Sequence, residues 1–204
     1  MLAQIDPESP LDDMEEASEF SRAAVLADLK NAADLIDHLN DWDEGLPELR
    51  AQQKAVRFGR IRRDARRQVA NEYVDHYSIQ FGDHLKLKVN KDLTSTEWKR
   101  FFGDTPSRFI KRPLGEQVAT IRGWLTTNHP TLEPYKAELT FWTDKADEVL
   151  QDDATSRQAT ADFHQARAAF AKRLTAKRDA LYRLLCERAE ERGLGRDWPL
   201  AFFR

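Results

Sequence analysis

Apolar side chains recur every three or four residues over most of the chain, which is the period of an amphipathic helix. The first such stripe holds Val25, Leu29, Ala32, Ile36 and Leu39. Ser9-Pro10 ahead of it is typical of a helix start, with serine as the N-cap and proline in the first turn. We therefore predict a first long helix from about residue 10 to Trp42.

A second helix is predicted to begin at Pro47. Its apolar positions Phe58, Ile61, Ala65 and Val69 lie within about 80° of one another around the helix axis. A stripe of this kind is typical of the side of a helix that faces a core. We expect these four side chains to be buried.

The period changes to two after residue 76. Apolar and polar residues alternate on both sides of Gly82-Asp83-His84, and the apolar ones are Tyr77, Ile79, Phe81, Leu85, Leu87 and Val89. This pattern predicts a β-hairpin with a three-residue loop and with all six side chains on one buried face.

Two shorter elements follow the predicted hairpin. Thr94–Glu97 resembles a capping box ahead of a short helix that ends at Gly103. Residues 107–112 are interpreted as a third short strand, and residues 114–127 as a helix. Residues 77–112 would then form a small α/β insert.

The last part of the chain repeats one helical phase in two blocks, from Leu132 to Val149 and from Phe163 to Leu184. Residues 151–162 between them contain only alanine as apolar content. One very long helix is one interpretation, and a new helix capped by Asp152-Asp153 is the other. We favour the break, because helices of more than 50 residues are rare in a compact domain. Gly193 is predicted to end the helix.

These elements predict a mainly α fold, an antiparallel bundle of about four long helices with a small β-hairpin/short-helix insert. A length of 204 residues suits one domain. We divide the chain into a flexible tail (1–9), a single helical-bundle domain (10–192) and an apolar C-terminal tail (193–204).

Composition excludes several classes of protein. Charged residues make up 33% of the chain, and the mean hydropathy is −0.70. No run approaches the roughly 18 apolar residues of a membrane span, so we expect no membrane partner. Seven carboxylates and no basic side chain precede Arg22, so we expect no signal peptide. With one cysteine, Cys186, we expect a cytoplasmic protein rather than a secreted, collagen-like or disordered one.

The net charge of −3 hides two opposite blocks. Residues 1–48 carry a net charge of −12, residues 49–112 a net charge of +9, and the remainder is neutral. The two blocks would neutralise each other if the first helix packed antiparallel to the second.

A cluster of arginines in the second helix is a candidate polyanion-binding site. Its six members are Arg57, Arg60, Arg62, Arg63, Arg66 and Arg67. Such a ladder could hold the phosphates of a nucleic acid. It could equally pair with the acidic first helix, whose charge would repel a polyanion.

Signals for catalysis are weak. Glu72 and His76, four residues apart on the second helix, are weak candidates for metal ligands, because helical di-metal sites use a Glu-x-x-His spacing that this chain lacks. The sequence has no P-loop, no nucleophile elbow and no dinucleotide fingerprint. We expect no cofactor.

The C-terminal tail is a candidate docking segment. It carries four large apolar residues, Trp198, Leu200, Phe202 and Phe203, which are too many to leave in water. The tail either folds back on its own chain or docks on another chain. We favour folding back, with Trp198 and Phe203 as anchors and with Pro199 preventing a further turn of α-helix.

Together these features favour a non-enzymatic, cytoplasmic interaction or assembly protein that binds a protein partner or itself. A nucleic-acid- or polyanion-associated protein using the arginine cluster is the first alternative. A helical-bundle metal protein or enzyme is the second.

Overall fold

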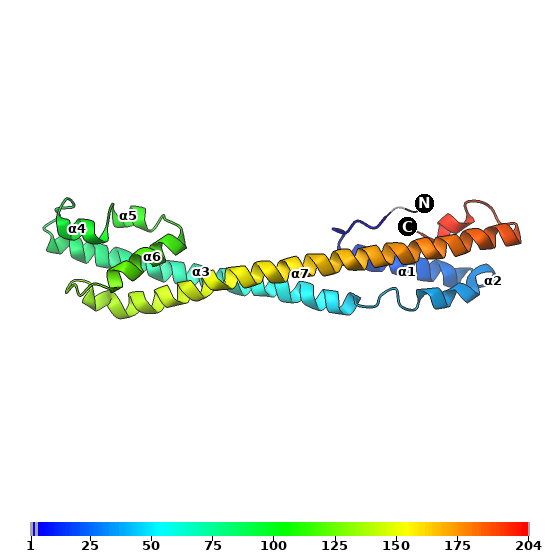
Figure 1. Ribbon diagram of the computed structural model, residues 1–204, viewed down its shortest axis with the longest axis horizontal. Helices are drawn as coiled ribbons and strands as arrows, with labels where there is room; N and C mark the ends of the chain where they lie inside the picture. Colours follow the sequence, from blue (N-terminus) through cyan, green and yellow to red (C-terminus); the bar gives the residue numbers. More distant parts are fainter. Residues whose placement is uncertain (1, 3, 204) are drawn as a thin grey trace. The chain divides into compact units, whose positions relative to one another are not determined.

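The structure is a computed structural model that describes residue 2 and residues 4–203. The regular elements of these residues are helices. In chain order they are α1 (Leu11–Ala27), α2 (Leu29–Ala32), the 3₁₀ helix η1 (Ala33–Leu39), α3 (Leu46–Lys88), α4 (Thr96–Phe101), α5 (Pro106–Phe109), α6 (Leu114–Leu125), α7 (Glu133–Arg192) and the 3₁₀ helix η2 (Trp198–Phe202) (Figure 1). The mainly α class is confirmed. The predicted bundle of about four long helices is not confirmed. The helices differ too much in length, since α3 has 43 residues and α7 has 60, whereas α1 has 17.

The predicted β-hairpin is wrong, because α3 continues as one helix to Lys88. Phe81 and Leu85 are fully buried while Leu87 is 67% exposed, so the side chains follow the helical period and not the period of two. The chain reverses instead at Asn90 and Lys91, which have positive φ angles of 53° and 65°.

The rest of the predicted α/β insert is also helical. The Ser95 side chain accepts a hydrogen bond from the Trp98 N–H and caps α4, so the short helix was predicted in the right place. The strand predicted over residues 107–112 is wrong, because Pro106–Phe109 form the helix α5. The predicted helix over 114–127 is confirmed as α6.

The first predicted helix is broken at Asp28. The φ and ψ angles of Asp28 are −114° and 54°, outside the helical region. Its carboxylate accepts hydrogen bonds from the side chains of Asn31 and Trp198. These bonds hold the break, so α2 and η1 form separate short helices. At the other end, Pro10 and not Ser9 occupies the N-cap position of α1.

The favoured break at Asp152-Asp153 is wrong as well, because α7 is continuous from Glu133 to Arg192. It ends where predicted: Gly193 has a φ angle of +65°, and the Leu194 N–H donates to the carbonyl of Ala189 at 2.8 Å. This is a glycine-dependent helix stop.

The chain divides into two compact units. Unit 1 comprises residues 1–57 and 158–204, and unit 2 comprises residues 58–157. Each unit has its own hydrophobic core. In unit 2 the core is mainly aromatic and contains Phe81, Phe101, Phe102 and Trp124. The prediction of one domain over residues 10–192 stays a prediction, since α3 and α7 contribute residues to both units. Residues 1, 3 and 204 of the predicted tails lie outside the described residues.

The two long helices are poorly buried in their middle parts. All residues of these stretches are described, yet none of α3 is buried between Leu49 and Ala70, and none of α7 between Val149 and Phe163. A helix face without a core partner therefore coincides with the apolar positions that the sequence singled out.

Candidate docking groove between α3 and α7

The apolar stripe of α3, which we define as Phe58, Ile61, Ala65 and Val69, lies on the surface. Phe58 is 42% exposed, Ile61 51% and Val69 48%, and Ala65 is exposed too. The prediction that these residues face the core is wrong. The periodicity was recognised correctly, but no element within the described residues buries this face.

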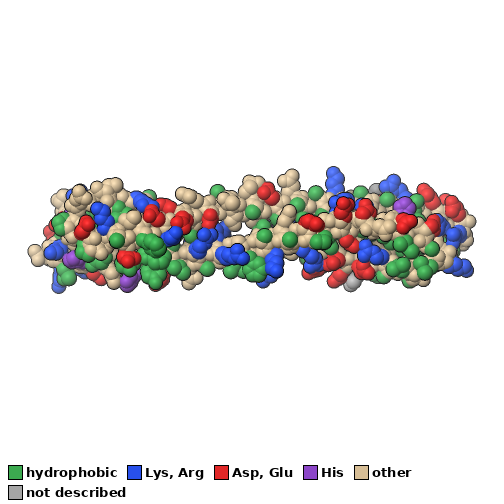
Figure 2. Space-filling view, turned by 90° about the horizontal axis from the view of Figure 1, so that it is seen from below, with side chains coloured by type: hydrophobic (Ala, Val, Ile, Leu, Met, Phe, Trp, Pro, Cys, Tyr) green, Lys and Arg blue, Asp and Glu red, His purple; other side chains and the backbone are tan. Residues whose placement is uncertain are grey.

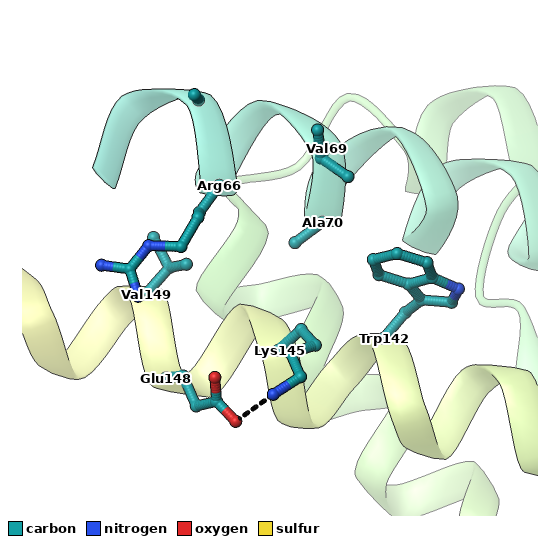
Figure 3. Close-up of a pocket in the computed structure, with 8 residues that line it drawn as sticks. Arg66, Val69, Ala70, Trp142, Lys145, Glu148 and Val149 are labelled. Carbon is teal, nitrogen blue, oxygen red and sulfur yellow. Dashed lines mark hydrogen bonds and ion pairs between the residues drawn. The ribbon is translucent and has the colours of Figure 1, made fainter. Parts of the chain in front are cut away.

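Part of the stripe opens into a groove between α3 and α7 within unit 2. The walls of this docking groove are mainly apolar, and its volume is about 270 Å³. Its lining residues are Ala65, Arg66, Val69, Ala70, Trp142, Lys145, Glu148 and Val149. Figure 3 shows Ala70 and Trp142 pointing from the two helices into the space between them, and Arg66 reaching from α3 toward Val149.

An aromatic pair holds one end of the groove. The rings of Tyr73 on α3 and Trp142 on α7 are stacked, with centroids 4.1 Å apart and planes 5° from parallel. Offset stacking of this kind stabilises a pair beyond its buried area by about 1 kcal/mol. The indole is therefore held as a fixed wall, and a fixed apolar wall suits an incoming side chain.

Ion pairs line the rim of the groove. Lys145 Nζ lies 2.6 Å from Glu148 Oε1, drawn as a dashed line in Figure 3. Arg66 binds Asp152 at 2.5 Å. Hydrophobic side chains and Lys or Arg side chains lie side by side along α3 and α7 on the face shown in Figure 2. The rim thus combines fixed charges with an apolar floor.

Three of the six arginines in the cluster pair with carboxylates of α7 and not with the acidic first helix. Arg63 and Arg67 both approach the Asp153 carboxylate, at 3.2 and 3.7 Å. Arg66 pairs with Asp152, and Arg60 with its own neighbour Asp64 at 3.7 Å. The acidic helix instead uses Asp12 and Glu15 to bind Arg50. The expectation that the acidic first helix neutralises the arginine cluster was wrong. Asp152 and Asp153, which the sequence suggested as a helix cap, lie opposite the cluster and pair with it instead.

Two members of the arginine cluster have no ion-pair partner among the described residues. Arg57 and Arg62 are exposed, and neither forms an ion pair with any residue that the structure describes. Arg62 lies in unit 2, on the same side of α3 as the apolar stripe by its helical position.

Glu72 and His76 are both exposed on α3. Among the described residues, no three or more His, Cys, Asp or Glu side chains are grouped so that they could hold a metal ion. The imidazole of His76 lies edge-on to the ring of Tyr77, with centroids 5.1 Å apart.

The C-terminal tail lies on its own chain in unit 1. Phe202 is 2% exposed and part of the core, and the Trp198 indole N–H donates to Asp28 Oδ2 at 3.0 Å. Trp198 and Phe203 are half-buried and pack against that core, whereas Leu200 is 48% exposed. Residues 198–202 form a 3₁₀ helix, which accommodates Pro199 near its start.

Sequence reasoning missed the α7 side of the groove. Trp142 and Val149 are seven residues apart, and this spacing was assigned to an ordinary core stripe. A usable signal was present: residues 151–162 lack large apolar side chains, so the facing part of α3 has little to pack against. Asp75, discussed below, was also missed.

Comparison with family models, with curated proteins and with solved structures finds no match to this chain. No helix in the described part of the chain is sufficiently long and apolar to cross a membrane. The structure itself defines the class as a mainly helical protein with an exposed, charge-rimmed apolar groove.

Proposed function

We propose that the protein is a non-enzymatic interaction protein, which binds a protein segment through the apolar stripe and the docking groove of unit 2. The observation that carries this proposal is the exposure of Phe58, Ile61 and Val69 on one face of α3, next to the apolar groove. Apolar patches that are contiguous and rimmed by polar residues are typical of interaction sites. The cytoplasmic location stays a prediction.

A polyanion-binding function has less support. Arg63, Arg66 and Arg67 already have carboxylate partners on α7. Displacing those carboxylates would offset much of the gain from binding phosphate, since affinity for nucleic acid comes largely from neutralising its charge. A metal-dependent activity has less support still, because Glu72 and His76 offer only two exposed ligands.

The proposal is tested by comparing the intact protein with two single variants as immobilised baits in an extract of the source cells. Val69→Glu places a charge in the docking groove. Leu26→Glu makes the same change at a side chain of equal exposure, 49% against 48%, in unit 1. We expect proteins that bind the intact chain and Leu26→Glu, but not Val69→Glu.

Two outcomes would contradict the proposal. Identical capture by all three baits would show that the groove does not bind protein. Salt-dependent retention of the intact protein on DNA or heparin, lost in Arg62→Glu and kept in Val69→Glu, would favour the polyanion alternative.

A further inference from the structure

We infer that unit 2 binds one internal water molecule between α3 and α6, through the side chains of Asp75, Ser78 and Gln117. None of the three lines the docking groove, so this site does not depend on the proposed function. The inference is carried by three buried oxygen atoms that have no hydrogen-bond partner among the described residues. They are Asp75 Oδ1, Ser78 Oγ and Gln117 Oε1.

The three atoms are closed to bulk solvent. Ser78 and Gln117 are both 0% exposed. Asp75 is half-buried, with its Oδ1 atom on the inside. Buried polar atoms are rarely left without a hydrogen bond, and an ordered water is the usual partner where the protein provides none. Three such atoms in one region therefore point to a bound molecule.

The three side chains meet where α3 packs on α6. Asp75 and Ser78 are three residues apart on α3, which makes them neighbours on one face of the helix. Burial raises the pKa of the Asp75 carboxyl, and Gln117 of α6 lies close enough to oppose that rise. About two turns further along both helices, the rings of Phe81 and Trp124 have centroids 5.5 Å apart. The two helices thus lie side by side over this stretch.

Neighbouring hydrogen bonds fix which atoms of the group can donate and which can accept. Gln117 Nε2 donates to the carbonyl oxygens of Ile110 and Arg112, at 3.2 and 3.0 Å. The amide cannot exchange its nitrogen and oxygen without losing both bonds, so Oε1 remains an acceptor. Asn71 donates to Asp75 Oδ2 at 2.9 Å, and this leaves Oδ1 as a second acceptor.

One water molecule satisfies all three atoms. It donates one hydrogen to Asp75 Oδ1 and the other to Gln117 Oε1, and it accepts a hydrogen bond from the hydroxyl of Ser78. Internal waters typically form about three hydrogen bonds. Donors and acceptors therefore balance without a second ligand.

Other small ligands leave part of the group unsatisfied. A proton on Asp75 would allow this carboxyl to donate to Gln117, but Ser78 would still lack a partner. A metal cation would bind oxygen lone pairs of all three side chains, but it could not accept the hydroxyl hydrogen of Ser78. Water is the ligand that both donates and accepts.

This water links three parts of unit 2. Asp75 and Ser78 attach it to α3, and Gln117 attaches it to α6. The amide nitrogen of Gln117 extends the same network to the carbonyl groups between α5 and α6. The water thus separates two acceptors that would otherwise repel each other across the contact of the two helices.

The first test is a crystal structure of the intact protein at a resolution that shows ordered waters. We expect one density peak at about 2.7–3.2 Å from each of the three oxygen atoms. A peak with six or more oxygen ligands at about 2.4 Å would identify a cation and overturn the inference. Direct bonding of Asp75 to Gln117, or of Ser78 to the Val74 carbonyl, without such a peak would also overturn it.

The second test counts long-lived internal waters in solution by oxygen-17 magnetic relaxation dispersion. Ser78→Ala removes the donor of the site, and we expect one long-lived water fewer than in the intact protein. Ser21→Ala is the matched control, because Ser21 is equally buried but its hydroxyl already donates to the Ala17 carbonyl at 3.2 Å in unit 1. Far-UV circular dichroism checks that both variants keep their helices. An unchanged count in Ser78→Ala, or an equal loss in both variants, would reject the assignment of the water to this site.

Discussion

Asp75 is a half-buried carboxylate on α3 with unusual surroundings for a charged group. Its Oδ2 accepts a hydrogen bond from Asn71 at 2.9 Å, while Oδ1 has no partner among the described residues. Burial raises the pKa of Asp75, the nearby polar side chains of Gln117 and Asn71 oppose that rise, and the nearby charge of Glu72 adds to it. Gln117 is fully buried, and its Oε1 also lacks a partner.

Asp75→Asn should therefore stabilise unit 2 at neutral pH. A carboxyl whose pKa is raised by folding favours the folded state when protonated, and this contribution is lost as the pH rises through the folded-state pKa. The amide carries no charge and offers a donor to Gln117. We expect a gain of about 1 kcal/mol in the free energy of unfolding at pH 7, and almost none at a pH of about 3. Urea unfolding at both pH values measures it, and an equal gain at both would contradict the argument.

Replacement by alanine should have opposite effects on stability at two glycines of α3. A Cβ on Gly82 would overlap the Pro106 ring and lie 3.2 Å from Phe102 Cζ, whereas a Cβ on Gly59 would meet nothing within 4 Å. Gly82→Ala should cost about 1–3 kcal/mol through overpacking. Gly59→Ala should gain about 0.5–1 kcal/mol, because it only improves helix propensity. Thermal unfolding of both variants compares them, and destabilisation by both would show that the close approach of α5 is not the cause.

At the scale of elements, the same glycine explains why the hairpin was predicted. Gly82-Asp83 between alternating apolar residues is a turn signal in sequence, but here Gly82 is a helix residue that lets α5 approach. Alternation and helical period overlap over six residues. The exposure of Leu87, next to the buried Phe81 and Leu85, separates the two patterns in the structure. Tertiary contact with α4, α5 and α6 decided the outcome, and the sequence contains no local trace of it.

Several features were predictable because they depend on local periodicity and caps. They are the helical class, the start of α3, the whole of α6, and the end of α7 at a glycine. The groove was not predictable as a groove. An apolar stripe indicates a helix face that is stabilised by packing against another surface. Whether the same chain provides that surface depends on the length and course of distant helices. Asp152-Asp153 illustrates the difficulty, since two adjacent carboxylates suit a helix cap and an arginine partner equally well.

The continuity of α7 makes Asp153 a link between helices. Its carboxylate is 20% exposed and lies between Arg63 and Arg67. Asp153→Asn should lower the free energy of unfolding by about 1 kcal/mol at low salt and by less at high salt. Asp162→Asn is the matched control, because Asp162 binds only Gln158 among the described residues. Thermal melts at two salt concentrations measure both, and equal effects of the two variants would rule out the arginine contacts as the cause.

At the scale of the whole molecule, the two units have separate cores but share α3 and α7. Phe202 belongs to the core of unit 1 and Phe81 to that of unit 2. The docking groove is built from unit 2 alone. Damage to the core of unit 1 should therefore leave the docking groove intact, which allows stability and binding to be measured separately.

The C-terminal tail provides that test. Phe202→Ala removes a side chain that is 2% exposed and should cost about 3–5 kcal/mol, whereas Leu200→Ala, at 48% exposure, should change stability by less than about 0.5 kcal/mol. Hydrogen exchange should locate the loss of protection in residues 11–39 and 163–185, which pack around Phe202 in one core, and not in residues 96–125. The mass of Phe202→Ala in solution should match that of the intact chain at each concentration. A change of mass without a loss of stability would instead mean that the tail docks on another chain, because a segment anchored within its own core must lower the free energy of unfolding when its anchor is removed.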